Sequence, residues 1–483
     1  MMSTIVSGNK ITFNELEQKI FSFVCCLGQE MTRTILESYD DELAQERDKE
    51  QYRDKGKRKT SIKTVYGEVP YERRVYCTRL EDGSTSYVYL LDEAVGMERI
   101  GLISTNLAQI IAMSVTENPF RKGAELITRT SGETISPSGA WNLLQKLGER
   151  ISDEEDLSVR RMESGEPEGT EETQILFEEM DGVWLRMQDA RHRKCPKKEM
   201  KVFTMYRGWD AEKEAEGRST LVGRKTLAGM EGSEEFHRKR EAYIEQTYNA
   251  DEIGRRILNG DGGSWIKETY DEEAIFQLDP YHVQKAIIKG LGDSSAREEV
   301  RAKLSAGEIE EALDYIHTYA DSVDSEDPSD KRSKNARELY SYLSNNREGL
   351  RPWQEQIGTV PEAPEGCCYK NMGVQENQNC SVITQRMKHR RMRWSEKGGN
   401  NMGKALSRRA NGELQETVRR YTDGLIYEPV LEEILEPLSA AMAPKKDGKG
   451  SAYIDRISVH MPLLDAVQTA ARKAFCNALK GVM

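Results

Sequence analysis

Apolar residues recur at three- and four-residue spacing near the start of the chain and predict a long helix there. The pattern runs through residues 12–52, beginning with FNELEQKIFSFVCC. Apolar and polar residues then alternate in SIKTVYGEVPYERRVYCTR and SYVYLL, as they do in half-exposed strands. We therefore predict an N-terminal helical region over residues 1–60 and a small β element over residues 61–92.

A second helical stretch is expected over residues 93–152, and its last two helices are separated by a short glycine-containing turn. NPFRKGAELITRTSG predicts a helix ending at Gly132, and SPSGAWNLLQKLGERI predicts the next, with Ser136 as N-cap and Pro137 at the first position. This pattern fits a DNA-binding helix-turn-helix, although ordinary helical hairpins share it and are more common. If the motif binds DNA, we expect contacts from the second helix by Ser136, Ser138, Trp141, Asn142 and Lys146.

A charged segment punctuated by glycine and proline predicts an acidic linker over residues 153–173. The pattern after it is β-β-β-α-β-α-β-α, with strands in TQILFEEMD, VWLRMQ, EMKVFTMY, RRILNGDG and AIFQLD. Asp181 and Gly182 are predicted to form the hairpin turn between the first two strands. This order predicts an α/β fold in which a mixed five-stranded sheet is flanked by helices.

The sheet pattern is interrupted by a wholly helical and charged stretch. We predict an all-helical insertion over residues 291–365, which divides the sheet domain into a first part, residues 174–290, and a second part, residues 366–425. Within the second part a helix is predicted from about Glu376 to Arg393. The remaining residues, 426–483, are predicted to form a helical tail.

Composition narrows the class of protein. The chain has 483 residues, 31% of them charged, with no apolar run of membrane-spanning length and no visible secretion signal, so we expect a cytoplasmic protein and no membrane partner. A formal net charge of -12 disfavours a polyanion partner, because nucleic-acid binding depends on Lys and Arg. Three basic clusters nevertheless favour such a partner locally: Arg53–Lys59, Arg191–Lys198 and Lys388–Arg393.

Several other site types find little support. No GxxxxGK[ST] or GxSxG pattern occurs, which disfavours a nucleotide-driven enzyme and a serine hydrolase. The eight cysteines contain no CxxC pair, so reduced thiols are expected. A zinc set is conceivable, but its spacing fits no standard zinc motif: Cys367, Cys368, Cys380 and His389.

Two aspartates follow strands that the expected topology makes neighbours. Asp181 closes the first predicted strand and Asp261 closes the fourth, and these strands lie side by side in a sheet ordered 3-2-1-4-5. Adjacent carboxylates repel each other unless a divalent cation lies between them. We therefore predict a hard-cation site here, where the glycines after Asp261 leave room for a phosphodiester. Taken alone, Asp181 is better explained as a residue of a hairpin turn.

These segments, together with LDPYHV and GVQENQNCSVITQRMKHRRMRWSEKGG, resemble the RNase H-like DDE transposases of bacterial insertion sequences. The closest resemblance is to the ISLre-type family, which is related to the Mutator-like group, and it covers most of the chain. It implies an RNase H-like core and a DNA transposase that cleaves and joins element ends. The implied partners are double-stranded DNA, with terminal inverted repeats and target sites, and further copies of the chain in a homo-oligomer at the nucleoid.

Carried over residue by residue, the resemblance makes Asp181, Asp261 and Glu376 the catalytic carboxylates that hold two Mg²⁺ or Mn²⁺ ions. Glu376 and Asn379 match the Glu-x-x-Asn that the family places at a helix start. Glu396 is the rival for the third carboxylate, and the segment GCCYKNMGVQENQNC departs from the family's usual context. Glu376 could also be a charge that favours a helix N-terminus.

The same resemblance places a histidine and a basic helix at the site. LDPYH matches an Asp-x-x-His signature, so Asp279 and His282 are expected beside the metals, with His282 contacting a phosphate or positioning a ligand. A satisfied histidine on a helix face is the plainer explanation. Along the helix that follows Glu376, the side chains expected to contact DNA are Arg386, Lys388, Arg390 and Arg391.

Two other functions fit parts of this pattern. A non-catalytic DNA-binding protein would use the helix-turn-helix and keep the sheet domain as a scaffold. An RNase H-like nuclease would hydrolyse strands without joining them. Both remain alternatives to the transposase, and a catalytically inactive copy remains a third.

Overall fold

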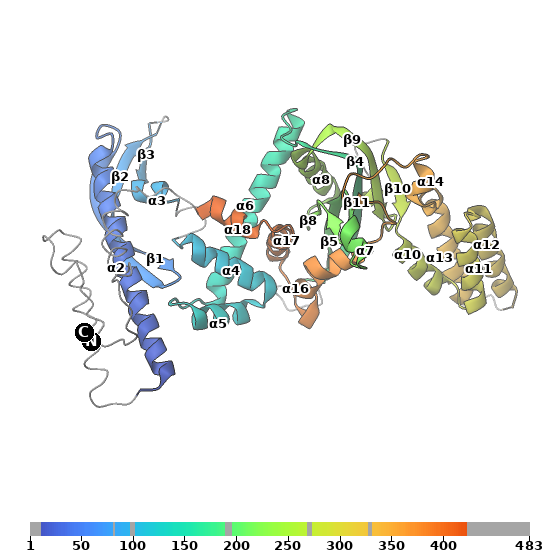
Figure 1. Ribbon diagram of the computed structural model, residues 1–483, viewed down its shortest axis with the longest axis horizontal. Helices are drawn as coiled ribbons and strands as arrows, with labels where there is room; N and C mark the ends of the chain where they lie inside the picture. Colours follow the sequence, from blue (N-terminus) through green and yellow to red (C-terminus); the bar gives the residue numbers. More distant parts are fainter. Residues whose placement is uncertain are drawn as a thin grey trace, which may run out of the picture. The chain divides into compact units, whose positions relative to one another are not determined.

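The computed structural model describes residues 11–80, 83–96, 102–188, 196–267, 273–326 and 331–422 (Figure 1). The chain divides into two compact units. One unit combines Met1–Leu143 with Leu414–Met483, and the other is Leu144–Glu413. The predicted tail over residues 426–483 and the first part of the basic cluster at residues 191–198 lie outside the described residues. Within the described ranges, no helix has the length and apolar character that crossing a bilayer requires.

The first unit begins with the long helix α2 (Phe13–Glu46), as predicted. Its first turn is closed by a capping box, in which the side chains of Thr12 and Glu15 accept each other's main-chain N–H groups. Helix α2 packs on a three-stranded antiparallel sheet. The strands are β1 (Arg53–Thr64), β2 (Gly67–Arg79) and β3 (Thr85–Val88).

The small β element is therefore confirmed, but β1 begins at Arg53 and not near residue 61. The basic cluster Arg53–Lys59 pairs with β2 through its backbone while its side chains remain exposed. The first half of β1 was not predicted because it lacks alternating apolar residues. It pairs nevertheless, since strand pairing requires only main-chain groups. The other helices of this unit are α3 (Leu90–Ala94), α4 (Thr105–Glu117), α5 (Phe120–Thr130), the start of α6 (Pro137–Glu163) and α18 (Leu414–Thr422).

The predicted helix pair at residues 118–150 is present as α5 and α6. Ser136 caps α6, because its hydroxyl accepts the N–H of Gly139 at 2.9 Å. Helix α6 does not end near residue 152, as predicted, but continues to Glu163 through the first half of the expected acidic linker. The charged stretch is helical because Val159 is buried and Glu155 forms an ion pair with the buried Lys404.

The second unit is built on a mixed five-stranded sheet in the order β10-β9-β4-β5-β8. Counted from β8, this is 3-2-1-4-5 in chain order, and the strand of Asp181 lies beside the strand that ends before Asp261, as predicted, although the second and third strands are not the predicted ones. The mixed α/β fold class is confirmed. Strand β9 pairs in parallel with both β4 and β10, whereas β5 pairs in antiparallel fashion with both β4 and β8. The strands are β4 (Glu171–Arg186), β5 (Lys197–Tyr206), β8 (Lys225–Gly229), β9 (Tyr248–Gly260) and β10 (Ile275–Leu278).

The predicted hairpin at Asp181–Gly182 is wrong. Both residues lie inside β4, where they pair with Val202 and Lys201 of β5, so the first two predicted strands form one strand. The glycine serves close packing, because a β-carbon at Gly182 would collide with the side chain of Glu199. The true third strand, β8, has only five residues and was not predicted.

Alternate residues of β4 face two different layers. Leu176 and Met180 pack in a cluster with Phe236 of helix α8 (Ser233–Thr247). Phe177 faces the opposite side, in a cluster with Trp209 and Trp353. Both faces of the sheet are thus covered, as a largely buried mixed sheet requires (Figure 1).

The all-helical insertion is confirmed by α11 (Ser294–Ser305), α12 (Ile309–Glu326) and α13 (Lys331–Asn345), which pack in one cluster with α10 (Pro280–Gly290). The chain then returns to the sheet through short elements. These are η1 (Arg347–Leu350), α14 (Trp353–Gln356), β11 (Cys367–Cys368), α15 (Gln375–Gln378), the π-helical η2 (Asn379–Thr384), α16 (Gln385–Met387), η3 (His389–Arg391) and α17 (Glu396–Ala410). The remaining short elements of the unit are β6 (Gly208–Asp210), α7 (Ala211–Ala215), β7 (Leu221–Val222) and α9 (Ser264–Lys267).

Candidate metal centre at the strand ends

Three aspartates lie at the same level of three neighbouring parallel strands, where β9 and β10 end and β4 continues. Met180 of β4 and Leu278 of β10 both pair with Gly260 of β9. The residue after each of these is an aspartate, namely Asp181, Asp261 and Asp279. Strand register therefore brings together acidic residues that are up to 98 positions apart in the sequence, from 181 to 279.

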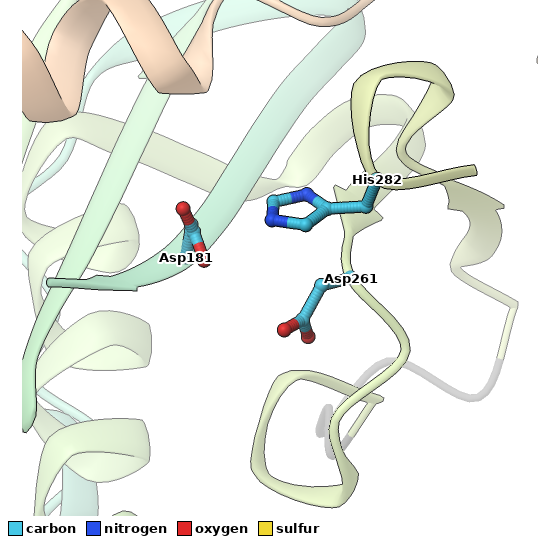
Figure 2. A group of neighbouring side chains, drawn as sticks. All are labelled: Asp181, Asp261 and His282. Atoms are coloured by element: carbon cyan, nitrogen blue, oxygen red, sulfur yellow. The ribbon is translucent and has the colours of Figure 1, made fainter. Parts of the chain in front are cut away.

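Asp181, Asp261 and His282 form one compact group of potential metal ligands. One ligand atom from each lies within 4.8 Å of the others, and all three residues are partly exposed. Figure 2 shows the three side chains pointing toward one another from β4, the turn after β9 and the first turn of α10. Among the described residues this is the one group of three or more His, Cys, Asp or Glu side chains with such geometry.

Asp279 orients the histidine of this group. It caps α10, where one carboxylate oxygen accepts the main-chain N–H of His282 at 3.3 Å and contacts His282 Nδ1 at 2.8 Å. Because Nδ1 is engaged by Asp279, Nε2 is the ring atom left for a ligand. The hydrogen bond to Asp279 raises the pKa of His282, and the nearby carboxylates of Asp181 and Asp261 add to the rise.

The two aspartates of the group lack a cationic partner. Neither Asp181 nor Asp261 forms an ion pair with a Lys or Arg side chain among the residues described. Burial raises the pKa of Asp181 to about 6, and the negative charges of Asp261 and Glu376 act in the same direction. His282 and the N–H of Gly182 oppose the rise without cancelling it. The site therefore holds excess negative charge near neutral pH.

A row of buried polar residues lies directly behind the aspartates. Glu179, Asn259 and Gln277 stand two positions before the three aspartates and pair across β4, β9 and β10. Their exposed fractions are 0%, 0% and 5%. We call these three residues the polar row. The sequence carried a signal for it, since the polar-x-Asp pattern recurs as EMD, NGD and QLD, but that repetition was not recognised.

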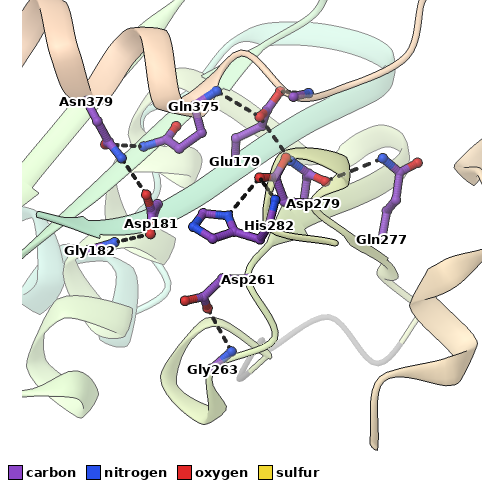
Figure 3. A network of polar contacts seen from close by, with 12 residues as sticks. Glu179, Asp181, Gly182, Asp261, Gly263, Gln277, Asp279, His282, Gln375 and Asn379 are labelled. Carbon is purple, nitrogen blue, oxygen red and sulfur yellow. Dashed lines mark hydrogen bonds and ion pairs between the residues drawn. The ribbon is translucent and has the colours of Figure 1, made fainter. Parts of the chain in front are cut away.

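The polar row is internally hydrogen-bonded and contacts the aspartates. Asn259 donates to Glu179 at 3.0 Å and to Asp279 at 3.3 Å, and Gln277 donates to Asn259 at 3.4 Å. Figure 3 labels Glu179, Gln277 and Asp279 in this network. Buried polar side chains are tolerated because each has a partner.

The helix expected to carry the third carboxylate does reach the site. Asn379 donates to Asp181 at 2.6 Å, so the predicted Glu-x-x-Asn segment lies against the first aspartate. Glu376 is exposed on α15 and its charge raises the pKa of Asp181, but it is outside the group of mutually close ligand atoms. Its rival Glu396 begins α17 and forms an ion pair with Lys198.

The glycines after Asp261 shape the turn that carries its carboxylate. Gly262 has a φ of +84°, which favours glycine, and a β-carbon there would collide with Asn346. The N–H of Gly263 donates to Asp261 at 2.9 Å. Tyr342 of the helical insertion donates to the carbonyl of Asp261 at 3.0 Å. The glycines were predicted to leave room for a phosphodiester. The backbone conformation of this turn is a second reason for glycine at position 262.

The side chains of α6 that are predicted to contact DNA lie at and near the N-terminus of this helix. Ser136, Ser138, Asn142 and Lys146 are exposed. Trp141 is half-buried and packs edge-on against Phe120, at 5.0 Å between ring centres. The aromatic ring therefore belongs to the packing of α5 on α6, whereas the other four side chains are available at the surface.

The basic helix after Asn379 fits its predicted role only in part. Arg386 is 4% exposed and lies over the ring of Trp394, so the prediction that it contacts DNA does not agree with its burial. Lys388 and Arg391 are exposed. The side chain of Arg390 lies outside the described residues. Cys367, Cys368, Cys380 and His389 do not form a ligand group in the described part of the chain, so the zinc hypothesis gains no support.

Comparison with known proteins places this architecture in a family. The sequence profile described as an uncharacterised protein family, UPF0236, matches residues 6–422. A UPF0236 protein from Caldanaerobacter subterraneus subsp. tengcongensis is 26% identical over 364 residues, which cover 74% of this chain and 72% of that protein. A second UPF0236 protein from the same organism is 26% identical over 365 residues, covering 74% of this chain and 71% of its own length.

Proposed function

The chain belongs to the UPF0236 family, and from this premise we propose that it is a metal-dependent DNA transposase of the RNase H-like DDE type. In this proposal it binds the ends of a mobile element, cleaves a strand there and joins it to target DNA. Double-stranded DNA with terminal inverted repeats is the substrate, and the active form is a homo-oligomer.

The observation that carries the proposal is the pair of aspartates without a Lys or Arg partner, Asp181 within β4 and Asp261 just after the end of the adjoining β9. Other acids of the same unit are compensated: Glu178 contacts Arg256, Glu231 contacts Lys404, and Glu179 accepts hydrogen bonds from neutral donors. Asp181 and Asp261 instead face each other and His282 within 4.8 Å. Like charges at this separation favour a bound divalent cation.

The donor set fits a divalent cation. Asp181 and Asp261 supply carboxylate oxygens, which suit Mg²⁺ and Mn²⁺, and His282 supplies Nε2, which Mn²⁺ accepts more readily than Mg²⁺ does. When bound, such an ion would stabilise the charge that develops on a phosphodiester during strand cleavage and joining. The second ion and the role of Glu376 as a ligand are also part of the proposal.

The protein's own groups hold the site in one orientation. Asn379 fixes one oxygen of Asp181, and the N–H of Gly182 contacts the other at 2.7 Å. Asp279 holds the ring of His282 with Nε2 directed away from the carboxylate that contacts Nδ1. These fixed contacts limit the reorganisation needed when a phosphodiester binds.

Two further observations support the transposase over a host nuclease. The name of one UPF0236 relative joins eleven gene designations of a single organism, and that of another joins four. Repeated genes for one protein are what a mobile element leaves in a genome. The exposed N-terminal face of α6 also offers polar and basic side chains for a DNA groove.

The test uses DNA that carries the inverted repeats flanking the gene. Purified protein with Mg²⁺ or Mn²⁺ should nick the element end and join it to a second duplex. Asp181→Ala and Asp261→Ala should each lower cleavage at least about 1,000-fold, while the dissociation constant for the same DNA, measured without metal, changes less than about threefold.

Lys285→Ala is a matched control, because this exposed residue lies on α10 one turn after His282 and contacts the ring of Tyr281 instead of the ligand group. Its cleavage rate should equal that of the wild type. Cleavage without joining would favour the nuclease alternative, binding without cleavage would favour the DNA-binding alternative, and full cleavage by Asp181→Ala would refute the site.

A further inference from the structure

Glu179 is the most heavily bonded buried acid near the candidate site. It is fully buried on β4, two residues before Asp181, and it accepts hydrogen bonds from five donors. Two donors are side chains, Tyr206 at 2.6 Å and Asn259 at 3.0 Å. No Lys or Arg forms an ion pair with it among the described residues, so hydrogen bonds alone compensate its burial.

The other three donors are consecutive main-chain N–H groups at the start of α15. Gly373, Val374 and Gln375 donate to Glu179 at 3.1, 3.2 and 3.1 Å. An N–H at a helix start has no partner within the helix, and a carboxylate is the side chain that satisfies it best. Here the carboxylate comes from a strand about 195 residues earlier in the chain, from 179 to 374.

The same strand contacts the same helix a second time. Asp181 accepts from Asn379 at 2.6 Å, and Gln375 donates to Asn379 at 3.0 Å (Figure 3). Glu179 and Asp181 are two positions apart on β4, a spacing of about 6.8 Å. Gln375 and Asn379 are four positions apart on the helix, a spacing of about 6 Å. Because the two spacings are similar, both contacts can form at the same time. This pairing leaves the helix little freedom to slide or rotate along β4.

We propose that Glu179 is a positioning residue, which sets the place of Glu376 and Asn379 relative to Asp181 by binding the start of their helix. The contact also reaches the far side of the site, since Asn259 links Glu179 to Asp279, which orients His282. One buried carboxylate thereby connects the segments that carry all four predicted catalytic residues. The metal-binding part of this inference rests on the proposed function, whereas the structural part does not.

The experiment compares Glu179→Gln with Glu178→Gln. Glu178 is the adjacent residue of the same strand and is 1% exposed, but it faces the other side of the sheet, where it bonds Arg256. Both variants lose a buried charge, so both should lower the unfolding midpoint. Only Glu179→Gln places an NH₂ group against the main-chain donors of Gly373–Gln375.

Amide hydrogen exchange without metal gives the first readout. Peptides covering residues 373–379 should exchange at least about tenfold faster in Glu179→Gln than in the wild type, and at the wild-type rate in Glu178→Gln. Equal protection in all three proteins would overturn the proposal. If Glu179→Gln does not fold, Asn259→Leu replaces it, since this change removes one donor to Glu179 and the donor to Asp279.

Mn²⁺ affinity, followed by the loss of the free-ion electron paramagnetic resonance signal, gives the second readout. Removing a residue that orients ligands weakens metal binding about 10–100-fold, which is the loss expected for Glu179→Gln and not for Glu178→Gln. Wild-type affinity in Glu179→Gln would contradict the positioning role. A wild-type protein that binds no Mn²⁺ would instead refute the proposed function, and the exchange result would still decide the role of Glu179.

Discussion

The two faces of strand β4 treat buried negative charge in opposite ways. On the α8 side, Glu178 and Glu241 share Arg256, with contacts of 2.6 and 2.7 Å, and the cluster is closed to further ligands. On the other side, the basic group close to Asp181 and Asp261 is His282, and neither aspartate forms an ion pair with Lys or Arg among the described residues. Glu179, on the same side, is held by five hydrogen-bond donors instead of a basic side chain. The comparison teaches that Glu178 and Glu179 have their partners within the protein, whereas the charge of Asp181 and Asp261 is available to a cation.

The largest effect expected from this comparison is on the closed face. Glu178→Gln breaks a buried charge pair and should lower the free energy of unfolding by about 3 kcal/mol, because Arg256 loses one of its two carboxylates. Denaturant unfolding of the purified variant measures it. A change below about 0.5 kcal/mol would mean that the two faces do not differ in the way described.

A smaller effect of opposite sign is expected on the open face. Asp181→Asn removes a partly buried charge and its repulsion with Asp261, and it should stabilise the metal-free protein at pH 7 by about 1 kcal/mol. The same variant should lose any stabilisation by Mn²⁺. Destabilisation by Asp181→Asn in metal-free buffer would argue that the carboxylate is a structural partner like Glu178.

The pH dependence sharpens the contrast. The pKa of Asp181 is raised to about 6 and that of His282 is raised as well, so the folded state holds both protons more tightly than the unfolded state does. The stability that the Asp181 proton contributes is therefore complete below about pH 4 and is lost as the pH rises through about 6. The advantage of Asp181→Asn over the wild type should appear across this interval and vanish below it, which unfolding curves at several pH values can establish.

The smallest effect concerns the cap of the helix proposed to enter a DNA groove. Ser136→Ala removes the hydroxyl that accepts the N–H of Gly139 and should cost about 1 kcal/mol. Because this change lies on neither face of β4, Mn²⁺ affinity should stay at the wild-type value. Weaker Mn²⁺ binding by Ser136→Ala would show that Mn²⁺ affinity follows the overall stability of the protein and not the charges on the two faces of β4.

Much of the fold was predictable because its signals are local. The spacing of apolar residues gave α2, α8 and the helical insertion, and the strand order 3-2-1-4-5 followed from alternating elements. Asp181 and Asp261 were paired correctly because register in a parallel sheet follows from topology. The predictions that failed relied on local sequence signals, which long-range packing overrode. Asp181–Gly182 looked like a turn, yet both residues pair with β5 inside a continuous strand.

The interior of the site was harder to predict, since its contacts are long-range and polar. Nothing local marks Glu179 as a partner for Gly373–Gln375, because a carboxylate in a strand is ordinarily exposed. The family resemblance led to the expectation that Arg386 contacts DNA, although its side chain is buried and its guanidinium lies over Trp394. Residue type alone did not separate an arginine that packs from one that binds phosphate.

The most direct test of the central claim is a Mn²⁺ titration of the wild type and of Asp181→Asn at pH 7.5, with free Mn²⁺ measured by electron paramagnetic resonance. The account predicts saturable binding by the wild type, weakened at least about 100-fold in the variant. It also predicts weaker binding at pH 5.5, where Asp181 and His282 hold protons. Equal binding by the two proteins, or no binding by the wild type, would contradict a cation site formed by these strand ends.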